Sequence, residues 1–129
     1  MIEYDDATPD VRAVYDDIMA TRGVTWINNF WKALAHDPAT LTRTWTSLKQ
    51  VMASDGALDP LTKEMLYVAV SVAQGCDYCV ASHTAAARKA GMTDAQYGEM
   101  LSIIGMAAET NRLAIALRVP VDAAFDPPR

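Results

Sequence analysis

Three prolines, each directly preceded by a helix-capping residue, constrain the fold of this chain more than any other feature. Thr8-Pro9, Asp37-Pro38 and Asp59-Pro60 each place a Thr or Asp at a helix N-cap and a proline at the first helical position. Behind these pairs, apolar residues recur at three- and four-residue spacings, for example between Leu41 and Met52. The pattern predicts amphipathic helices that begin at these three points.

Glycines and further capping residues divide the rest of the chain into about six or seven helices. The expected ranges are Pro9 to Gly23, Asn28 to His36, Pro38 to near Gly56, Leu61 to Gln74, Cys76 to Ala90, and Asp94 to about Arg118. We expect a bend near Gly105 and an irregular tail from about residue 120, which includes Pro127-Pro128. The alternation of Val68, Val70 and Val72 would also suit a buried strand, but no second convincing strand could pair with it. We therefore predict an all-α fold.

Length and charge narrow the class of protein. A chain of 129 residues suits a single domain, residues 1–129, and 51% hydrophobic with 21% charged residues is typical of a globular protein. The net charge of −5 argues against a nucleic-acid partner, which needs a basic face. The sequence has no apolar run of about 18 residues, and its acidic amino end differs from a secretory signal. We expect a cytoplasmic protein with no membrane partner.

The two cysteines and one of the two histidines form a constellation. Cys76, Cys79 and His83 are spaced by three and four residues, which places them on one face of a helix. Cys76 lies in the expected first turn, where unpaired N–H groups and the helix dipole stabilise a thiolate. His83, one turn beyond Cys79, can accept the Cys79 proton or pair with its thiolate. Because the loop between the cysteines is tiny, we expect a reversible, redox-active bridge rather than a structural one.

Glu64 is the fourth candidate for this site. It precedes Gly75 by 11 residues, and His83 follows Gly75 by 8 residues. If the chain folds back at Gly75, the two side chains lie at depths that differ by about 4.5 Å along the helices. A carboxylate facing His83 would fix its tautomer and support it as a base. Glu64 also precedes the apolar stretch 65–70, where a charge needs a partner or a function.

Simpler interpretations of these residues stay open. His83 alone suits a partly buried histidine bonded to a carbonyl, and Glu64 alone suits a surface charge paired with Lys63. The four candidates also offer two sulfurs, a nitrogen and an oxygen, a donor set that zinc accepts. Structural zinc sites usually draw more thiolates from separate loops, so we favour redox chemistry and predict no metal and no other cofactor.

The string from Glu64 through Cys76-Asp77-Tyr78-Cys79-Val80-Ala81-Ser82-His83 resembles the signature of the AhpD-like family, the carboxymuconolactone decarboxylase superfamily. The later stretch Thr110-Asn111-Arg112-Leu113-Ala114 is similar to its peroxidase-related members, and the resemblance covers roughly residues 25–120. It implies an AhpD-like helical bundle with the redox motif at the start of a core helix. It also implies a homo-oligomer, a trimer or a hexamer. Short helices in a small domain leave apolar faces that neighbours can cover, so Trp31, Trp45 and the last helix are candidate contacts, although the tryptophans also suit the core.

The resemblance also implies an activity and roles for the residues. Hydroperoxides would be reduced by Cys79 as the peroxidatic cysteine and Cys76 as the resolving one, with His83 and Glu64 as a proton relay. The reductant would be a dithiol of the dihydrolipoamide or thioredoxin kind. From position alone the cysteine roles could be exchanged, because Cys76 is closer to the helix start. Where the best-established alkylhydroperoxidases carry a histidine between the cysteines, this sequence has Tyr78.

Two other functions compete with this hypothesis. Glu64 and His83 could act as acid and base in a lactone decarboxylation or isomerisation, although the superfamily's decarboxylases generally lack the cysteine pair. Alternatively, Cys76 and Cys79 could serve a non-enzymatic redox switch. Loss of all activity in a Cys79→Ser protein would separate the peroxidase from the decarboxylase. Repeated peroxide turnover with a dithiol would separate it from the switch.

Overall fold

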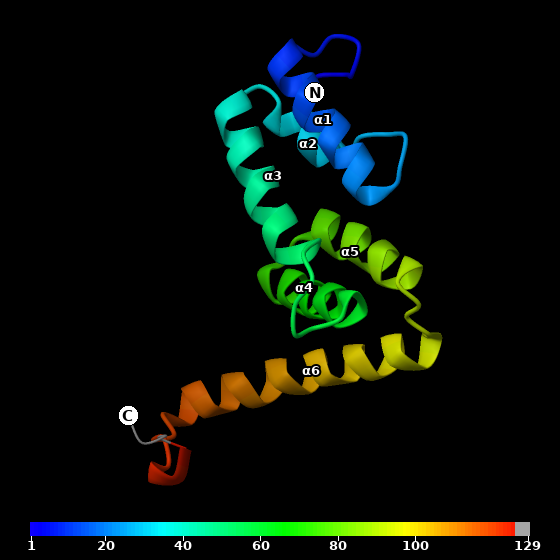
Figure 1. Ribbon diagram of the computed structural model, residues 1–129. Helices are drawn as coiled ribbons and strands as arrows, with labels where there is room; N and C mark the ends of the chain where they lie inside the picture. Colours follow the sequence, from blue (N-terminus) through cyan, green and yellow to red (C-terminus); the bar gives the residue numbers. More distant parts are fainter. Residues whose placement is uncertain (126–129) are drawn as a thin grey trace. The chain divides into compact units, whose positions relative to one another are not determined.

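The computed structural model describes residues 1–125 and confirms the all-α prediction: the described residues contain six α-helices and no strand. The helices are α1 (Pro9–Arg22), α2 (Asn29–Leu34), α3 (Pro38–Met52), α4 (Pro60–Gln74), α5 (Asp77–Lys89) and α6 (Asp94–Leu117), followed by a short 3₁₀ turn, η1 (Ala123–Phe125) (Figure 1). The chain divides into two compact units, residues 1–57 and the residues from Leu58 onward. The single domain over residues 1–129 stays a prediction.

The predicted helix starts agree with the structure. Pro9, Pro38 and Pro60 are each the first helical residue, and the Asp37 and Asp59 side chains accept hydrogen bonds from backbone N–H groups of the first turn. Thr8 holds the N-cap position without a side-chain hydrogen bond. At the start of α6, Thr93 and Gln96 bond each other's backbone N–H groups in a capping box.

Three expectations about local structure need correction or comment. The ambiguous stretch 68–72 is helical, as part of α4. The bend expected near Gly105 does not divide the last helix, because α6 continues through this residue as one element. Most of the tail from residue 118 to 125 is irregular, but residues 123–125 form a 3₁₀ turn. The Pro127-Pro128 pair lies outside the described residues.

The first unit is built around two tryptophans. Trp31 of α2 and Trp45 of α3 are buried and meet edge to face, with ring centroids 5.5 Å apart. Val11, Tyr15 and Ile18 of α1 complete this core. Of the two positions expected for Trp31 and Trp45, the core or a subunit contact, the structure shows the core. Both rings serve the interior of their own unit, since each completes the hydrophobic face of a short helix.

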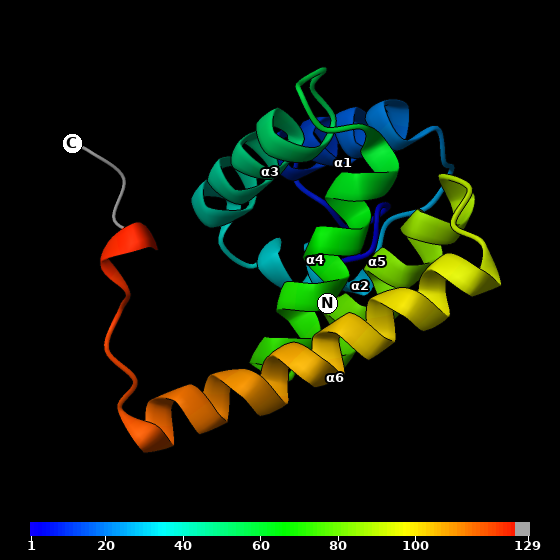
Figure 2. The ribbon, with the colours of Figure 1, turned by 90° about the horizontal axis from the view of Figure 1, so that it is seen from below.

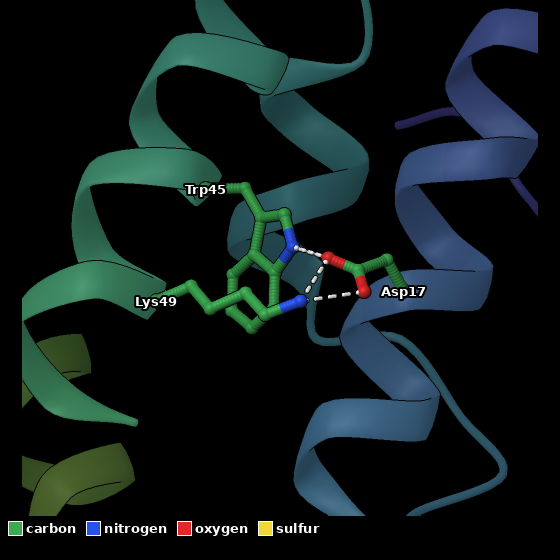
Figure 3. Close-up of polar contacts among 3 residues, drawn as sticks. All are labelled: Asp17, Trp45 and Lys49. Carbon is green, nitrogen blue, oxygen red and sulfur yellow. Dashed lines mark hydrogen bonds and ion pairs between the residues drawn. The ribbon is translucent and has the colours of Figure 1, made fainter. Parts of the chain in front are cut away.

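A polar cluster ties α1 to α3 at the edge of this core. The Trp45 indole donates to Asp17 Oδ2 at 2.6 Å, and Lys49 Nζ lies 2.7 Å from Asp17 Oδ1 (Figure 3). Hydrogen bonds from Lys49 and then from Trp45 lower the pKa of Asp17. The carboxylate thus lets a buried indole satisfy its N–H group while α3 packs against α1.

The second unit carries the motif predicted from the sequence. The chain reverses at Gly75, so that α5 returns along α4, and α6 packs on α4. Val68, Ala87, Met92 and Met100 form the buried core between these helices. Every residue singled out for chemistry belongs to α4, to α5 or to the turn that joins them, so this unit contains the whole candidate site.

The helix α6 is exposed for most of its length. Of its 24 residues only Met100 is buried, and its second half continues past α4 and α5 (Figures 1 and 2). Six of its large apolar side chains are exposed: Leu101, Ile103, Met106, Leu113, Ile115 and Leu117. Among residues 1–125 it is the one helix that is long and apolar enough to cross a membrane, by length and composition alone. The sequence has no unbroken apolar run of this length, and the expectation that no helix crosses a membrane stays a prediction.

Candidate active site

The helix α4 is fixed at its start by Asp59. The Asp59 carboxylate accepts hydrogen bonds from the Thr62 backbone N–H at 3.0 Å and from the Thr62 hydroxyl at 2.8 Å. These hydrogen bonds lower the pKa of Asp59, because they favour its charged form. Two residues after Thr62, Glu64 lies in the second turn of the helix that this cap defines.

The turn at Gly75 sets the register between α4 and α5. Gly75 adopts the left-handed conformation, with φ of 69°, which a residue without Cβ reaches at little cost. The N–H groups of Gly75 and Cys76 donate to the carbonyls of Val72 and Ser71, at 3.1 and 3.0 Å. These bonds close the end of α4 and direct the chain immediately into α5.

Cys76 is the N-cap of α5 rather than a residue of its first turn, one position earlier than expected. Its backbone is extended, with φ of −97° and ψ of 90°, and its Sγ accepts from the Cys79 backbone N–H at 3.3 Å. A disulfide joins Cys76 to Cys79, whose Cα atoms are 5.3 Å apart. The Cys76 sulfur therefore lies at the positive end of the α5 dipole, where a thiolate is favoured.

Glu64 and His83 meet across the two helices, as their distances from Gly75 predict. Glu64 Oε2 lies 2.6 Å from His83 Nδ1, and the side chains are only 19% and 11% exposed. With the proton on Nδ1, the carboxylate accepts the hydrogen bond and the lone pair of the imidazole is on Nε2. His83 follows Cys79 by one helical turn of α5, so the imidazole and the Cys79 side chain share a helix face.

Tyr67 is a neighbour of the site that the sequence motif does not include. The Tyr67 ring stacks on the His83 imidazole, with ring centroids 3.6 Å apart and planes inclined by 17°. Tyr67 follows Glu64 by three residues on α4, so both side chains lie on the face that meets α5. That spacing is the sequence signal that could have identified Tyr67, which otherwise reads as one more apolar residue of the stretch.

Tyr78, which replaces the histidine of the better-known peroxidases, has a side chain that is 43% exposed. Within residues 1–125, no group of three or more His, Cys, Asp or Glu side chains has the arrangement of a metal site. The structure thus joins the four predicted residues in two pairs, the Cys76–Cys79 disulfide and the Glu64–His83 contact, with Cys79 and His83 one turn apart on α5. Chemically, this arrangement can exchange electrons at sulfur and move a proton at Nε2.

This fold and motif define a class. The family model "Carboxymuconolactone decarboxylase family" matches residues 39–122, and the chain belongs to this family. A crystal structure of the alkylhydroperoxidase AhpD core from Rhodospirillum rubrum is 61% identical in sequence, with a TM-score of 0.89. The match covers 91% of this chain and 86% of that protein. The AhpD-like fold is therefore confirmed, as is the resemblance on which it was predicted.

Two curated relatives carry no functional name. "Uncharacterized protein 4 in cox locus" of Paracoccus denitrificans is 35% identical over 71 residues, which are 55% of this chain and 61% of that protein. "Uncharacterized protein H16_B0147" of Cupriavidus necator is 32% identical over 80 residues, 62% of this chain and 71% of that protein. The first alignment thus spans less than two thirds of the relative. Membership of the family indicates an enzyme-type protein.

Proposed function

We propose that the protein is a thiol-dependent hydroperoxide reductase that cycles between a Cys76/Cys79 dithiol and the disulfide. The observation that carries this proposal is the 2.6 Å contact between Glu64 and His83 Nδ1, one helical turn from a cysteine pair joined as a disulfide. A relay of this kind supplies a base to a nucleophile. The similarity to the AhpD core of Rhodospirillum rubrum supports the same chemistry.

The oxidative half of the cycle begins with the dithiol. His83 Nε2 accepts the Cys79 proton, and the Cys79 thiolate attacks the terminal oxygen of a hydroperoxide. The O–O bond breaks, sulfur is oxidised to a sulfenic acid, and the alkoxide leaves as an alcohol with the proton from His83. The Cys76 thiolate then attacks the Cys79 sulfur, and hydroxide leaves as water after it takes up a proton. The S–S bond forms in this step.

The reductive half needs an external dithiol, for which we propose a dihydrolipoamide-like or thioredoxin-like donor. One thiolate of the donor attacks the disulfide and forms a mixed disulfide, and the second displaces the protein sulfur. The donor ends as a disulfide and both cysteines regain their protons. The Cys76 sulfur suits a leaving group, since the Cys79 N–H and the α5 N-terminus stabilise its thiolate.

The test is steady-state consumption of cumene hydroperoxide with dihydrolipoamide as the donor. Wild-type protein is expected to turn over many times per disulfide, while Cys79→Ser and Cys76→Ser each stop the cycle. An acid/base decarboxylase would instead keep its activity in Cys79→Ser. A passive redox switch would oxidise once and consume no further peroxide. Either result would contradict the proposed reductase.

We also propose that the chain assembles with copies of itself, as a trimer or a hexamer. One of the exposed apolar side chains of α6, Ile103, lines a groove of about 310 Å³ between α4 and α6, together with Met65, Leu66, Ala69, Met100 and Ile104 among others. The second half of α6 from another copy would cover such a surface. The charged Glu109 and Arg112 in that half favour a protein partner over the hydrocarbon of a membrane. We keep the cytoplasm as the proposed compartment, because its reducing thiols would recycle the disulfide.

A further inference from the structure

The imidazole of His83 is held by two side chains, and only one of them belongs to the proton relay. Glu64 contacts one edge of the ring through Nδ1. Tyr67 covers one face, with the two ring centroids 3.6 Å apart and the planes inclined by 17°. At this distance and inclination the rings overlap over most of their area, which makes this a face contact rather than an edge contact.

The backbone of α4 around Tyr67 is held by a buried hydrogen bond and by a buried neighbour. The Ser71 hydroxyl donates to the Tyr67 carbonyl at 2.8 Å, and Ser71 is buried with 4% of its surface exposed. The next residue along α4, Val68, is also buried, in the core of the second unit. The contact with His83 is a stacking of the two rings. The contact between Tyr67 and His83 therefore depends on the aromatic ring and not on its polar group.

The two contacts restrict different motions of the imidazole. A single hydrogen bond to Nδ1 leaves the ring free to pivot about the line from Nδ1 to the carboxylate oxygen. Such a pivot would displace Nε2, the nitrogen on the far side of the ring. A flat ring stacked on one face opposes the pivot, because any tilt either separates the planes or makes them clash.

We propose that Tyr67 is a positioning residue, which holds the plane of the His83 imidazole so that Nε2 stays directed for proton transfer with the cysteine pair. The role in turnover rests on the proposed hydroperoxide reductase. The orientation of the ring does not rest on it. Tyr67 touches no reacting atom, and its effect passes entirely through His83.

The test combines proton NMR of the two histidines with steady-state kinetics in Tyr67→Phe and Tyr67→Leu. His36 is exposed and serves as an internal reference, and a His36→Gln variant assigns the signals. In wild-type protein the His83 ring protons are expected upfield of those of His36, with Overhauser contacts to the Tyr67 ring. Tyr67→Phe is expected to keep the upfield shift of the His83 protons and their Overhauser contacts to the ring at position 67. Tyr67→Leu moves the His83 protons downfield and lowers kcat by roughly tenfold, with KM for the hydroperoxide within about twofold.

Tyr97→Leu is the matched control, because Tyr97 packs on the core of the same unit and its ring faces the Arg88 guanidinium. It is expected to lower stability and to leave the His83 signals and kcat unchanged. Absence of the Tyr67–His83 Overhauser contact in wild-type protein overturns the proposal, even if Tyr67→Leu does not fold. A Tyr67→Phe protein as impaired as Tyr67→Leu overturns it as well. If the wild-type protein reduces no hydroperoxide, the reductase fails, while the NMR comparison still decides whether Tyr67 orients the ring.

Discussion

Glu64 Oε2 and His83 Nδ1 lie 2.6 Å apart and join α4 to α5 across the Gly75 turn. Both side chains are largely shielded from solvent, so the contact is stronger than a surface ion pair between the same groups would be. It also decides which imidazole nitrogen is left for chemistry. Since Nδ1 faces the carboxylate, Nε2 is the nitrogen that can exchange a proton with sulfur.

Removal of either member of this pair is expected to slow hydroperoxide reduction. His83→Gln removes the base, and kcat/KM should fall by roughly 10² to 10³, the usual contribution of a general base. Glu64→Gln keeps the size of the side chain and loses its charge, and we expect a smaller loss of about tenfold. Peroxide consumption with dihydrolipoamide measures both. Equal activity in the two variants and the wild type would mean that the pair has only a structural role.

The reactivity of Cys79 tests the relay without any peroxide. In a Cys76→Ser background only one thiol is left, and iodoacetamide alkylation at neutral pH reports its thiolate. His83→Gln in that background should slow alkylation, because the neutral amide neither accepts the proton nor pairs with the sulfur. Glu64→Gln should slow it less. An alkylation rate that is unchanged in both variants would contradict the activation of Cys79 by His83.

Mild oxidation should form the Cys76–Cys79 disulfide within one chain and reversibly. Mass spectrometry of the reduced protein after treatment with one equivalent of peroxide should find the loss of two hydrogens, and dithiothreitol should restore them. In the Cys76→Ser protein the oxidised Cys79 has no partner, so dimedone should trap it as a sulfenic acid. If dimedone instead traps a sulfenic acid in Cys79→Ser, Cys76 is the peroxidatic cysteine and Cys79 the resolving one. Disulfide-linked dimers as the main product would argue against an intramolecular cycle.

The exposed surface of α6 should determine the size of the assembly. Light scattering of the wild-type protein at micromolar concentration is expected to give the mass of a trimer or a hexamer. Leu113→Asp or Ile115→Asp places a charge on this apolar surface and should reduce the mass toward that of a monomer. Ala95→Glu, in the exposed first turn of the same helix, is the control. A wild-type monomer, or a protein that sediments with phosphatidylcholine vesicles, would contradict self-association through α6.

The stability of the first unit should depend on pH through Asp17. Hydrogen bonds from Lys49 and Trp45 lower the pKa of Asp17 below its ordinary value of 3.8. Because the folded-state pKa is the lower one, Asp17 stabilises the fold fully above the unfolded-state value, and this contribution is lost as the pH falls through the folded-state value. Asp17→Asn should therefore destabilise at neutral pH and approach wild type as the pH falls below the unfolded-state pKa. Urea unfolding at several pH values measures the difference.

Trp45→Phe tests the hydrogen-bond donor in the polar cluster of Asp17, Trp45 and Lys49. The variant keeps an aromatic ring in the core and loses the 2.6 Å hydrogen bond from the indole to Asp17. Since Asp17 is partly exposed and keeps Lys49, we expect a loss of about 1 kcal/mol of unfolding free energy. Phe30→Leu, a change at an exposed aromatic of the same unit, provides a comparison. A larger loss at Phe30 than at Trp45 would mean that the polar cluster contributes little.

The sequence by itself determined where the helices begin and which residues make up the motif. Capping residues and prolines act within one turn of the chain, so Pro38 and Pro60 could be placed as helix starts without knowledge of the fold. Gly75 acts locally too, and it is why the distances of Glu64 and His83 from the turn predicted their contact. The chemistry of Cys76, Cys79 and His83 followed from spacing along one helix.

Only the tertiary structure decided which atoms of those residues meet and which side chains surround them. Whether Glu64 meets Nδ1 or Nε2, and whether Tyr67 lies on the imidazole or in solvent, depends on the rotation of α4 against α5. That rotation is set by the packing of side chains such as Val68 and Ala87, which the order of residues does not specify. The burial of Trp31 and Trp45 in one core has the same origin. Contacts between helices are selected by shape and solvent exclusion over the whole unit, whereas caps and turns are selected within a few residues.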